Sequence, residues 1–125
     1  MIDLKAFVFV YGTLKRGFWN NALLKRARFI GEGITLERFR LYTVGFPYAV
    51  PDPEGLPLRG EVYQVDGKTL IELDNLEGYP IHYLRKTVRV RLTDGREVEA
   101  YIYYRNEGRG APVPPKGEFY VWEGE

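Results

Sequence analysis

The stretch FVFVYGTLKRGFWN, Phe7–Asn20, begins as an apolar strand and changes abruptly into a loop of small and basic residues. Residues 6–11 are apolar without alternation, which is typical of a fully buried strand. The loop that follows contains Gly12, Thr13 and Gly17. Backbone N–H groups exposed at the end of a strand can bind a ligand, so the loop is either a binding loop or a plain turn. Lys15 and Arg16 either add positive potential there or are solvated.

The length and composition predict one domain, residues 1–125, that can bury a core and enclose a pocket. Lys and Arg number 18 against 17 Asp and Glu, a formal net charge of +1 that disfavours a dedicated nucleic-acid binder. No apolar run approaches the ~20 residues that span a bilayer, and the N-terminus lacks the pattern of a signal peptide. We therefore expect a cytoplasmic protein without nucleic-acid or membrane partners. Nothing in the sequence indicates its oligomeric state.

The numbers of cysteine and histidine residues limit which reaction mechanisms the chain can use. The chain has no cysteine and a single histidine, His82. A disulfide, a thiolate nucleophile and a cysteine-ligated metal are therefore impossible, and one histidine cannot form a two-histidine zinc site. We expect no metal and no cofactor, and any proton transfer must depend on a carboxylate, a tyrosine, a lysine or His82.

Strands dominate the rest of the chain. A short helix is predicted over Asn20–Ala27 with Asn20 as its N-cap, and Leu70, Leu73 and Leu76 predict a second helix that ends at Gly78 and Pro80. Asp94-Gly95 is a strong hairpin signal, and Gly31 and Gly33 indicate a bend or bulge. Strands are expected over residues 6–11, 29–36, 39–44, 48–50, 60–65, 84–92 and 96–104. The pattern predicts an α+β fold: a small β-barrel or strongly curved mixed sheet with a few short helices.

The second helix carries a carboxylate on its apolar side. Glu77 falls seven residues after Leu70 and four after Leu73, in the middle of the apolar arc. A buried carboxylate is costly unless it is paired, hydrogen-bonded or neutral. Glu77 is therefore either functional, frayed into solvent or paired with an arginine. Asp74 lies at the edge of the same arc as a rival, and position alone does not separate the two.

Other groups are less distinctive. The loop after the first strand lacks the spacing of a P-loop and of a dinucleotide fingerprint, so nucleotide binding has no support. His82 follows a proline turn and is expected at the surface or in packing. Tyr103 could point into a pocket, although strand propensity alone explains it. Arg85, Arg89 and Arg91 form either a basic stripe or, as we expect, a solvated face.

Three motifs in order, FVYGTLKRG (9–17), GEVYQVD (60–66) and LDNLEGYPIHYLRKTVRV (73–90), make the chain resemble the γ-glutamylcyclotransferase superfamily. The likeness is greatest to its small γ-glutamylamine cyclotransferase-like members and covers roughly residues 7–104. It implies a small β-barrel flanked by helices. It also implies that Glu77 is the general acid/base and that the γ-glutamyl group is held by Tyr11, Gly12, Thr13 and Leu14. By the same resemblance Tyr103 and Arg85 are candidate pocket residues.

The activity that the resemblance implies is cyclisation of the γ-glutamyl group of an amine or amino acid to 5-oxoproline, which frees the amine. The α-amino nitrogen of such a substrate is its own nucleophile, so the protein needs only to fold the substrate and supply one base. Removal of a γ-glutamyl protecting group by the same cyclisation is a second enzymatic interpretation. The alternative from another class is a non-catalytic module that binds small amino-acid-like ligands or RNA. A small γ-glutamyl molecule is the expected partner.

Overall fold

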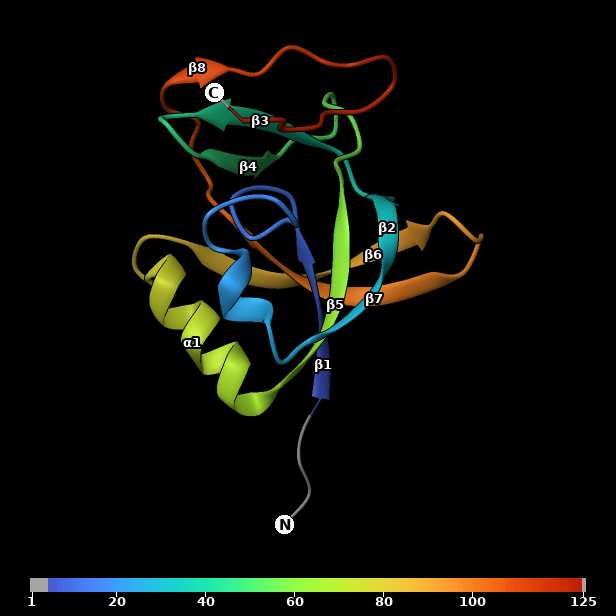
Figure 1. Ribbon diagram of the computed structural model, residues 1–125. Coiled ribbons are helices and arrows are strands. Elements are labelled where there is room, and N and C mark those ends of the chain that lie inside the picture. The colour runs from blue at the N-terminus through green and yellow to red at the C-terminus, as the bar shows by residue number, and fades with distance from the viewer. Residues whose placement is uncertain (1–4, 125) are drawn as a thin grey trace.

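Five strands form a closed barrel in the structure, a computed structural model that describes residues 5–124. Their order around the barrel is β1-β5-β2-β6-β7, and β1 runs parallel to β7 where the barrel closes, while the other neighbours are antiparallel (Figure 1). The bounds are β1 Lys5–Val10, β2 Arg28–Thr35, β5 Arg59–Asp66, β6 Leu84–Leu92 and β7 Glu97–Tyr104. The predicted small mixed barrel is confirmed.

The barrel strands follow the alternation of the sequence. On β6, Val88, Val90 and Leu92 are buried and the arginines between them are exposed. Arg89 and Arg91 pair with acids of β7 across the hairpin that Asp94-Gly95 closes. These two arginines therefore lie on a solvated face, as expected, and the predicted irregularity in β2 is a register shift between Phe29 and Gly31.

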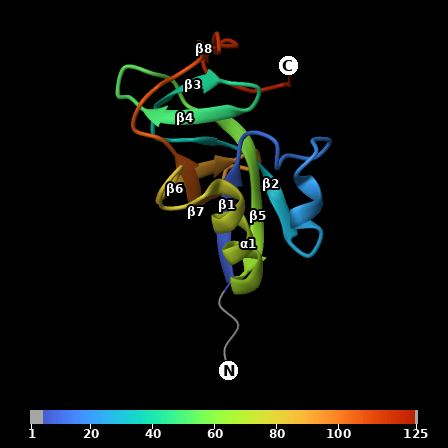
Figure 2. The ribbon, with the colours of Figure 1, turned by 90° about the vertical axis from the view of Figure 1, so that its left-hand side faces the viewer.

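A three-stranded sheet of order β4-β3-β8 covers one end of the barrel (Figures 1 and 2). Its strands are β3 Phe39–Thr43, β4 Pro47–Pro51 and β8 Ala111–Pro112. The edge strand predicted over 48–50 corresponds to β4, whose Tyr48 and Ala49 are fully buried. This sheet brings Pro47 and Tyr48 against the open end of the barrel, where β1 stops.

The α-helix α1, Gly67–Glu77, lies on the outside of the barrel along β1 and β5 (Figure 2). Asp66 caps its first turn by accepting a hydrogen bond of 2.7 Å from the backbone N–H of Thr69. Gly78 ends it in the left-handed conformation at φ 65°. The predicted second helix is therefore confirmed. Within residues 5–124, no helix has the length and apolarity needed to cross a membrane.

The short helix predicted over Asn20–Ala27 is confirmed only in part. A 3-10 helix, η1 Asn21–Leu24, forms there with Asn20 at its N-cap position, but the Asn20 side chain makes no capping hydrogen bond. Instead, Asn20 Nδ2 donates to Thr13 Oγ1 at 2.9 Å, and Asn21 Nδ2 donates to the carbonyl of Leu14 at 2.8 Å. Asparagine side chains readily bond to nearby polar groups in place of supporting a helix. Here those bonds hold the loop after β1 in shape.

Candidate active site

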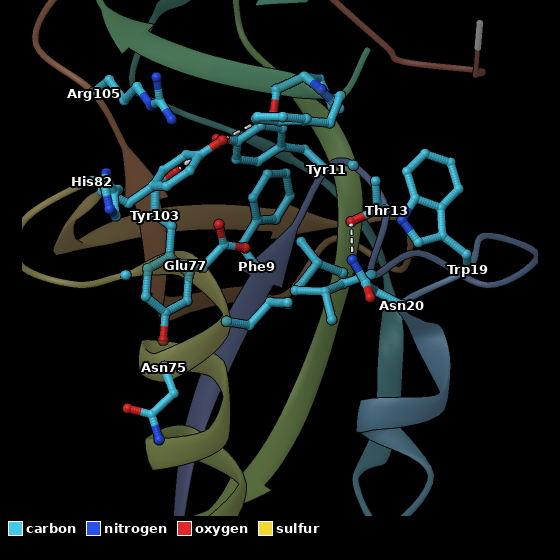
Figure 3. A pocket seen from close by; sticks show the side chains of 18 residues that line it. Phe9, Tyr11, Thr13, Trp19, Asn20, Asn75, Glu77, His82, Tyr103 and Arg105 are labelled. Atoms are coloured by element: carbon cyan, nitrogen blue, oxygen red, sulfur yellow. Dashed lines mark hydrogen bonds between the residues drawn. The ribbon is translucent and has the colours of Figure 1, made fainter. Parts of the chain in front are cut away.

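A pocket of about 400 Å³ lies where β1 ends, between the loop after it, the start of β4 and the C-terminal end of α1 (Figure 3). Its lining includes all four loop residues, Tyr11–Leu14, together with Glu77 and Tyr103. The lining also includes Trp19, Asn20, Pro47, His82, Tyr83 and Arg105. The structure therefore brings together the predicted loop residues Tyr11–Leu14 and the predicted helix residue Glu77. Of the two further candidates, Tyr103 lines the pocket and Arg85 does not.

The loop residues that line this pocket include three with unused backbone donors. The carbonyls of Gly12 and Thr13 accept hydrogen bonds of 3.0 Å from the N–H groups of Lys15 and Asn20, and that of Leu14 accepts from Asn21. By contrast, the N–H groups of Gly12, Thr13 and Leu14 donate to no protein group within residues 5–124. Three such donors in succession can bind a carboxylate or a developing oxyanion.

Gly12 is required by close packing. A Cβ built on Gly12 would lie 2.6 Å from Cγ of Pro47, and Gly12 is not among the glycines with positive φ. The loop backbone thus touches β4 directly at the wall of the pocket.

Tyr11 contributes its ring to the lining while its hydroxyl is occupied. That hydroxyl donates to the carbonyl of Tyr103 at 2.7 Å and accepts from the N–H of Ala49 at 3.0 Å. Tyr11 therefore ties the start of the loop to β7 and β4, and only its aromatic face is available to a ligand.

Glu77, the last residue of α1, faces the pocket (Figure 3). Burial raises its pKa from the ordinary value of 4.5 to about 7, and the positive charge of Arg105 opposes part of that rise. Glu77 forms no hydrogen bond or ion pair with the described part of the chain. The ion pair left open by the sequence is thus not formed, and the carboxyl group can exchange a proton near neutral pH.

Asp74 and Arg85 form an ion pair beside the pocket. Arg85 Nη1 donates to both carboxylate oxygens of Asp74, at 2.6 and 2.7 Å, and the hydroxyl of Tyr103 donates to Asp74 Oδ1 at 2.6 Å. Tyr103 lines the pocket with its ring. Arg85, predicted as a pocket residue, is not part of the lining, because its guanidinium is held by Asp74 between the rings of Tyr79 and Tyr101.

Arg105 is a charged residue of the pocket lining that the sequence did not reveal. It directly follows β7, and its N–H donates to the carbonyl of Ala49 at 2.9 Å. Its guanidinium lies 4.6 Å from the ring centre of Tyr83 and 4.9 Å from that of Tyr48. Its buried Nε has no hydrogen-bond partner in residues 5–124. The only sequence signal was its position at the end of a tyrosine-rich strand.

Neither of the two cations of the loop, Lys15 and Arg16, is among the residues that line the pocket. Lys15 is buried, and its Nζ donates to the carbonyl of Trp122 at 2.5 Å; burial lowers its pKa. Arg16 lies over the ring of Phe29 and pairs with Glu61 and Glu32.

His82 is exposed at the rim of the pocket, in agreement with its expected surface position. No cluster of three or more histidine or acidic side chains able to hold a metal occurs within the described range, 5–124.

Fold and site together define a class: a small mixed β-barrel whose pocket combines a strand-end loop of free N–H donors with one buried carboxyl group and one guanidinium. Comparison with known proteins identifies the family. The model of the family described as "Gamma-glutamyl cyclotransferase, AIG2-like" matches residues 8–122. The chain belongs to this family, and the resemblance of its sequence motifs is confirmed.

Individual relatives support the same family assignment. A protein of Methanocaldococcus jannaschii, provisionally named a gamma-glutamylcyclotransferase, is 43% identical over 119 residues, which cover 94% of this chain and 98% of the relative. The human gamma-glutamylaminecyclotransferase is 41% identical over 131 residues, covering 89% of this chain and 82% of that protein. The crystal structure of an AIG2-like protein from Mus musculus superposes with a TM-score of 0.76 at 34% identity, covering 83% and 80% of the two chains.

Proposed function

We propose that this protein cyclises the γ-glutamyl group of a γ-glutamyl amine or amino acid to 5-oxoproline and releases the free amine. The observation that carries the proposal is the position of Glu77, a carboxyl group with a pKa of about 7 that faces the same pocket as the free N–H donors of the loop. The names of the relatives agree with this chemistry.

The reaction divides into two proton movements. The carboxylate of Glu77 takes a proton from the substrate α-ammonium group, and the freed α-amino nitrogen attacks the γ-carbonyl carbon to close a five-membered lactam. As the bond from that carbon to the leaving nitrogen breaks, the protonated Glu77 returns its proton to the leaving nitrogen. The ring nitrogen gives up its second extra proton, which ends on the expelled amine, so the products are the neutral lactam and the amine as its ammonium ion. A carboxyl group with a pKa near the working pH suits both steps.

Binding is assigned to the loop and to Arg105. The N–H groups of Gly12–Leu14 are suited to the negative charge that develops on the γ-carbonyl oxygen. The guanidinium of Arg105, held over two tyrosine rings, is suited to the substrate α-carboxylate. Both reacting groups belong to one molecule, so holding it folded supplies much of the rate.

The test is incubation with γ-glutamyl-ε-lysine and several γ-glutamyl dipeptides, followed by detection of 5-oxoproline. We expect 5-oxoproline and free amine in equal amounts, and no turnover once the substrate α-amino group is acetylated, because that nitrogen is the nucleophile. Release of the amine from the acetylated compound would mean that the amide is hydrolysed by another route. No turnover on the whole panel would favour a non-catalytic binding module.

A further inference from the structure

The loop that carries the free N–H donors is held from outside the pocket by the segment 119–123. Lys15 directly follows the three donors, and its Nζ donates to the carbonyl of Trp122 at 2.5 Å. The ring of Phe18 packs against the indole of Trp122 with 4.8 Å between the ring centres. Trp19, which lines the pocket, meets the same indole edge-on at 6.0 Å. Trp122 thus contacts three residues of the loop, although it is not among the residues that line the pocket.

This segment is fixed to the barrel independently of the loop. The carbonyl of Tyr120 accepts a hydrogen bond of 2.9 Å from the N–H of Arg59, the first residue of β5. The N–H of Tyr120 donates to the carbonyl of Pro57, also at 2.9 Å. Both Tyr120 and Trp122 are buried. Trp122 therefore gives the loop a fixed point of attachment.

The attachment uses a buried cation. Lys15 is only 8% exposed, and its Nζ lies 5.4 Å from the ring centre of Phe18. Removing an ammonium group from water is costly, and the charges of Glu61 and Glu123 offset part of that cost. An aliphatic side chain of the same length would fill the space without the cost. It would not supply the directed hydrogen bond from Nζ to the carbonyl of Trp122, so the ammonium group contributes position.

We propose that Lys15 is a positioning residue, whose hydrogen bond to Trp122 holds the N–H groups of Gly12–Leu14 where they stabilise the developing oxyanion. The inference rests on the proposed function, which assigns that task to these donors. Lys15 acts only through the loop backbone, because its side chain does not line the pocket. Fixed donors stabilise a transition state best, and a misplacement of about 1 Å can lower a rate by about 10²-fold. Loss of the bond should therefore lower kcat and leave KM nearly unchanged, because Arg105 still binds the substrate.

The experiment replaces the ammonium group of Lys15 by a methyl group at constant side-chain length. The chain has no cysteine, so the thiol of Lys15→Cys is unique and can be alkylated in urea before refolding. Alkylation with 2-bromoethylamine restores an ammonium group at the position of the lysine Nζ, and alkylation with 1-iodopropane places a methyl group there. On γ-glutamyl-ε-lysine we expect the ammonium form to regain the native kcat. The propyl form should stay lower by about tenfold or more, with KM values within about twofold of each other.

Lys68→Cys, taken through the same two alkylations, is the matched control. Lys68 is exposed in the first turn of α1 and does not line the pocket, so its ammonium and propyl forms should have equal kcat. Lys15→Met, produced without refolding, should repeat the loss of kcat seen in the propyl form.

The outcomes separate the two proposals. Equal kcat for the ammonium and propyl forms of Lys15→Cys, or a change mainly in KM, would overturn this inference alone. Failure of both the propyl form and Lys15→Met to fold would show a purely structural role for Lys15 and would also overturn it. No 5-oxoproline from the native protein would overturn the proposed function and this inference with it.

Discussion

Asp74 and Glu77 lie one turn apart on α1, and their carboxyl groups have opposite environments. Asp74 accepts hydrogen bonds from Arg85 and Tyr103 and is fully engaged. Glu77 faces the pocket without a partner among residues 5–124, and burial raises its pKa to about 7. One carboxylate therefore ties the helix to the barrel, and the other is available for the proton transfer that we propose.

Arg105→Gln should raise KM for γ-glutamyl substrates. A hydrogen bond to a charged group contributes about 1.5–3 kcal/mol, so we expect kcat/KM to fall by about 10-fold to 100-fold. Kinetics on γ-glutamyl-ε-lysine measures this loss. The corresponding 4-aminobutanoyl amide lacks the α-carboxylate, and its slow cyclisation should be insensitive to the substitution. An equal loss on both compounds would show that Arg105 does not bind the α-carboxylate.

Gly12→Ala should destabilise the protein, because the new Cβ would lie 2.6 Å from Pro47 Cγ. Forcing an atom into a packed site costs about 1–3 kcal/mol, which urea denaturation can measure. Gly67→Ala is the control, since a Cβ there meets nothing within 4 Å and the residue starts a helix. It should leave stability unchanged or slightly raised. Equal stability of the two variants would show that the loop moves freely away from β4.

The sequence predicted the features that depend on neighbouring residues. The alternation of β6, the Asp94-Gly95 hairpin and the leucine spacing of α1 are local, and Glu77 could be placed on the apolar arc from spacing alone. The choice between Glu77 and Asp74 could not be made in this way. It depends on Arg85 and Tyr103, which are 11 and 29 residues from Asp74 and reach it only through the strand pairing of β6 with β7.

The sequence misjudged the role of Asn20 and missed Arg105 for the same physical reason. Asn20 was predicted to cap a helix, and its side chain instead bonds to Thr13. Arg105 follows a strand without any motif, and it reaches the pocket because β7 lies against β4, where the Arg105 N–H meets the carbonyl of Ala49. Both outcomes depend on contacts between segments whose pairing no local pattern specifies.

The difference in stability between Glu77→Gln and the native protein should grow with pH. Between about 4.5 and about 7 the unfolded chain releases the Glu77 proton while the folded chain retains it, so the native protein loses stability as pH rises through this window. Glutamine does not titrate. From about 1.4 kcal/mol per pKa unit, the variant should gain on the order of 3 kcal/mol at pH 8 relative to pH 4. Urea denaturation of both proteins across this range measures the difference, and parallel curves would mean that Glu77 titrates at its ordinary value.

Glu77→Gln should abolish most of the catalysis while substrate binding is largely kept. Glutamine preserves the size of the side chain but cannot accept and return a proton, and such groups contribute about 10²–10⁴-fold to rate. We expect kcat to fall by at least that factor with KM little changed, measured as 5-oxoproline formed from γ-glutamyl-ε-lysine. In the native protein kcat/KM should rise with pH through about 7, because the base must be deprotonated.

Asp74→Asn is the matched control, since it makes the same chemical change one turn earlier on α1. It removes the charge that holds Arg85 and weakens the bond from Tyr103, so stability should fall by about 1–3 kcal/mol. Its rate should stay within about tenfold of the native protein, because Asp74 touches the pocket only through Tyr103. The two variants thus separate the roles: one loses rate and gains stability, and the other loses stability and keeps rate. If Asp74→Asn ended turnover while Glu77→Gln left it near normal, the proton transfer would have to be assigned to Asp74.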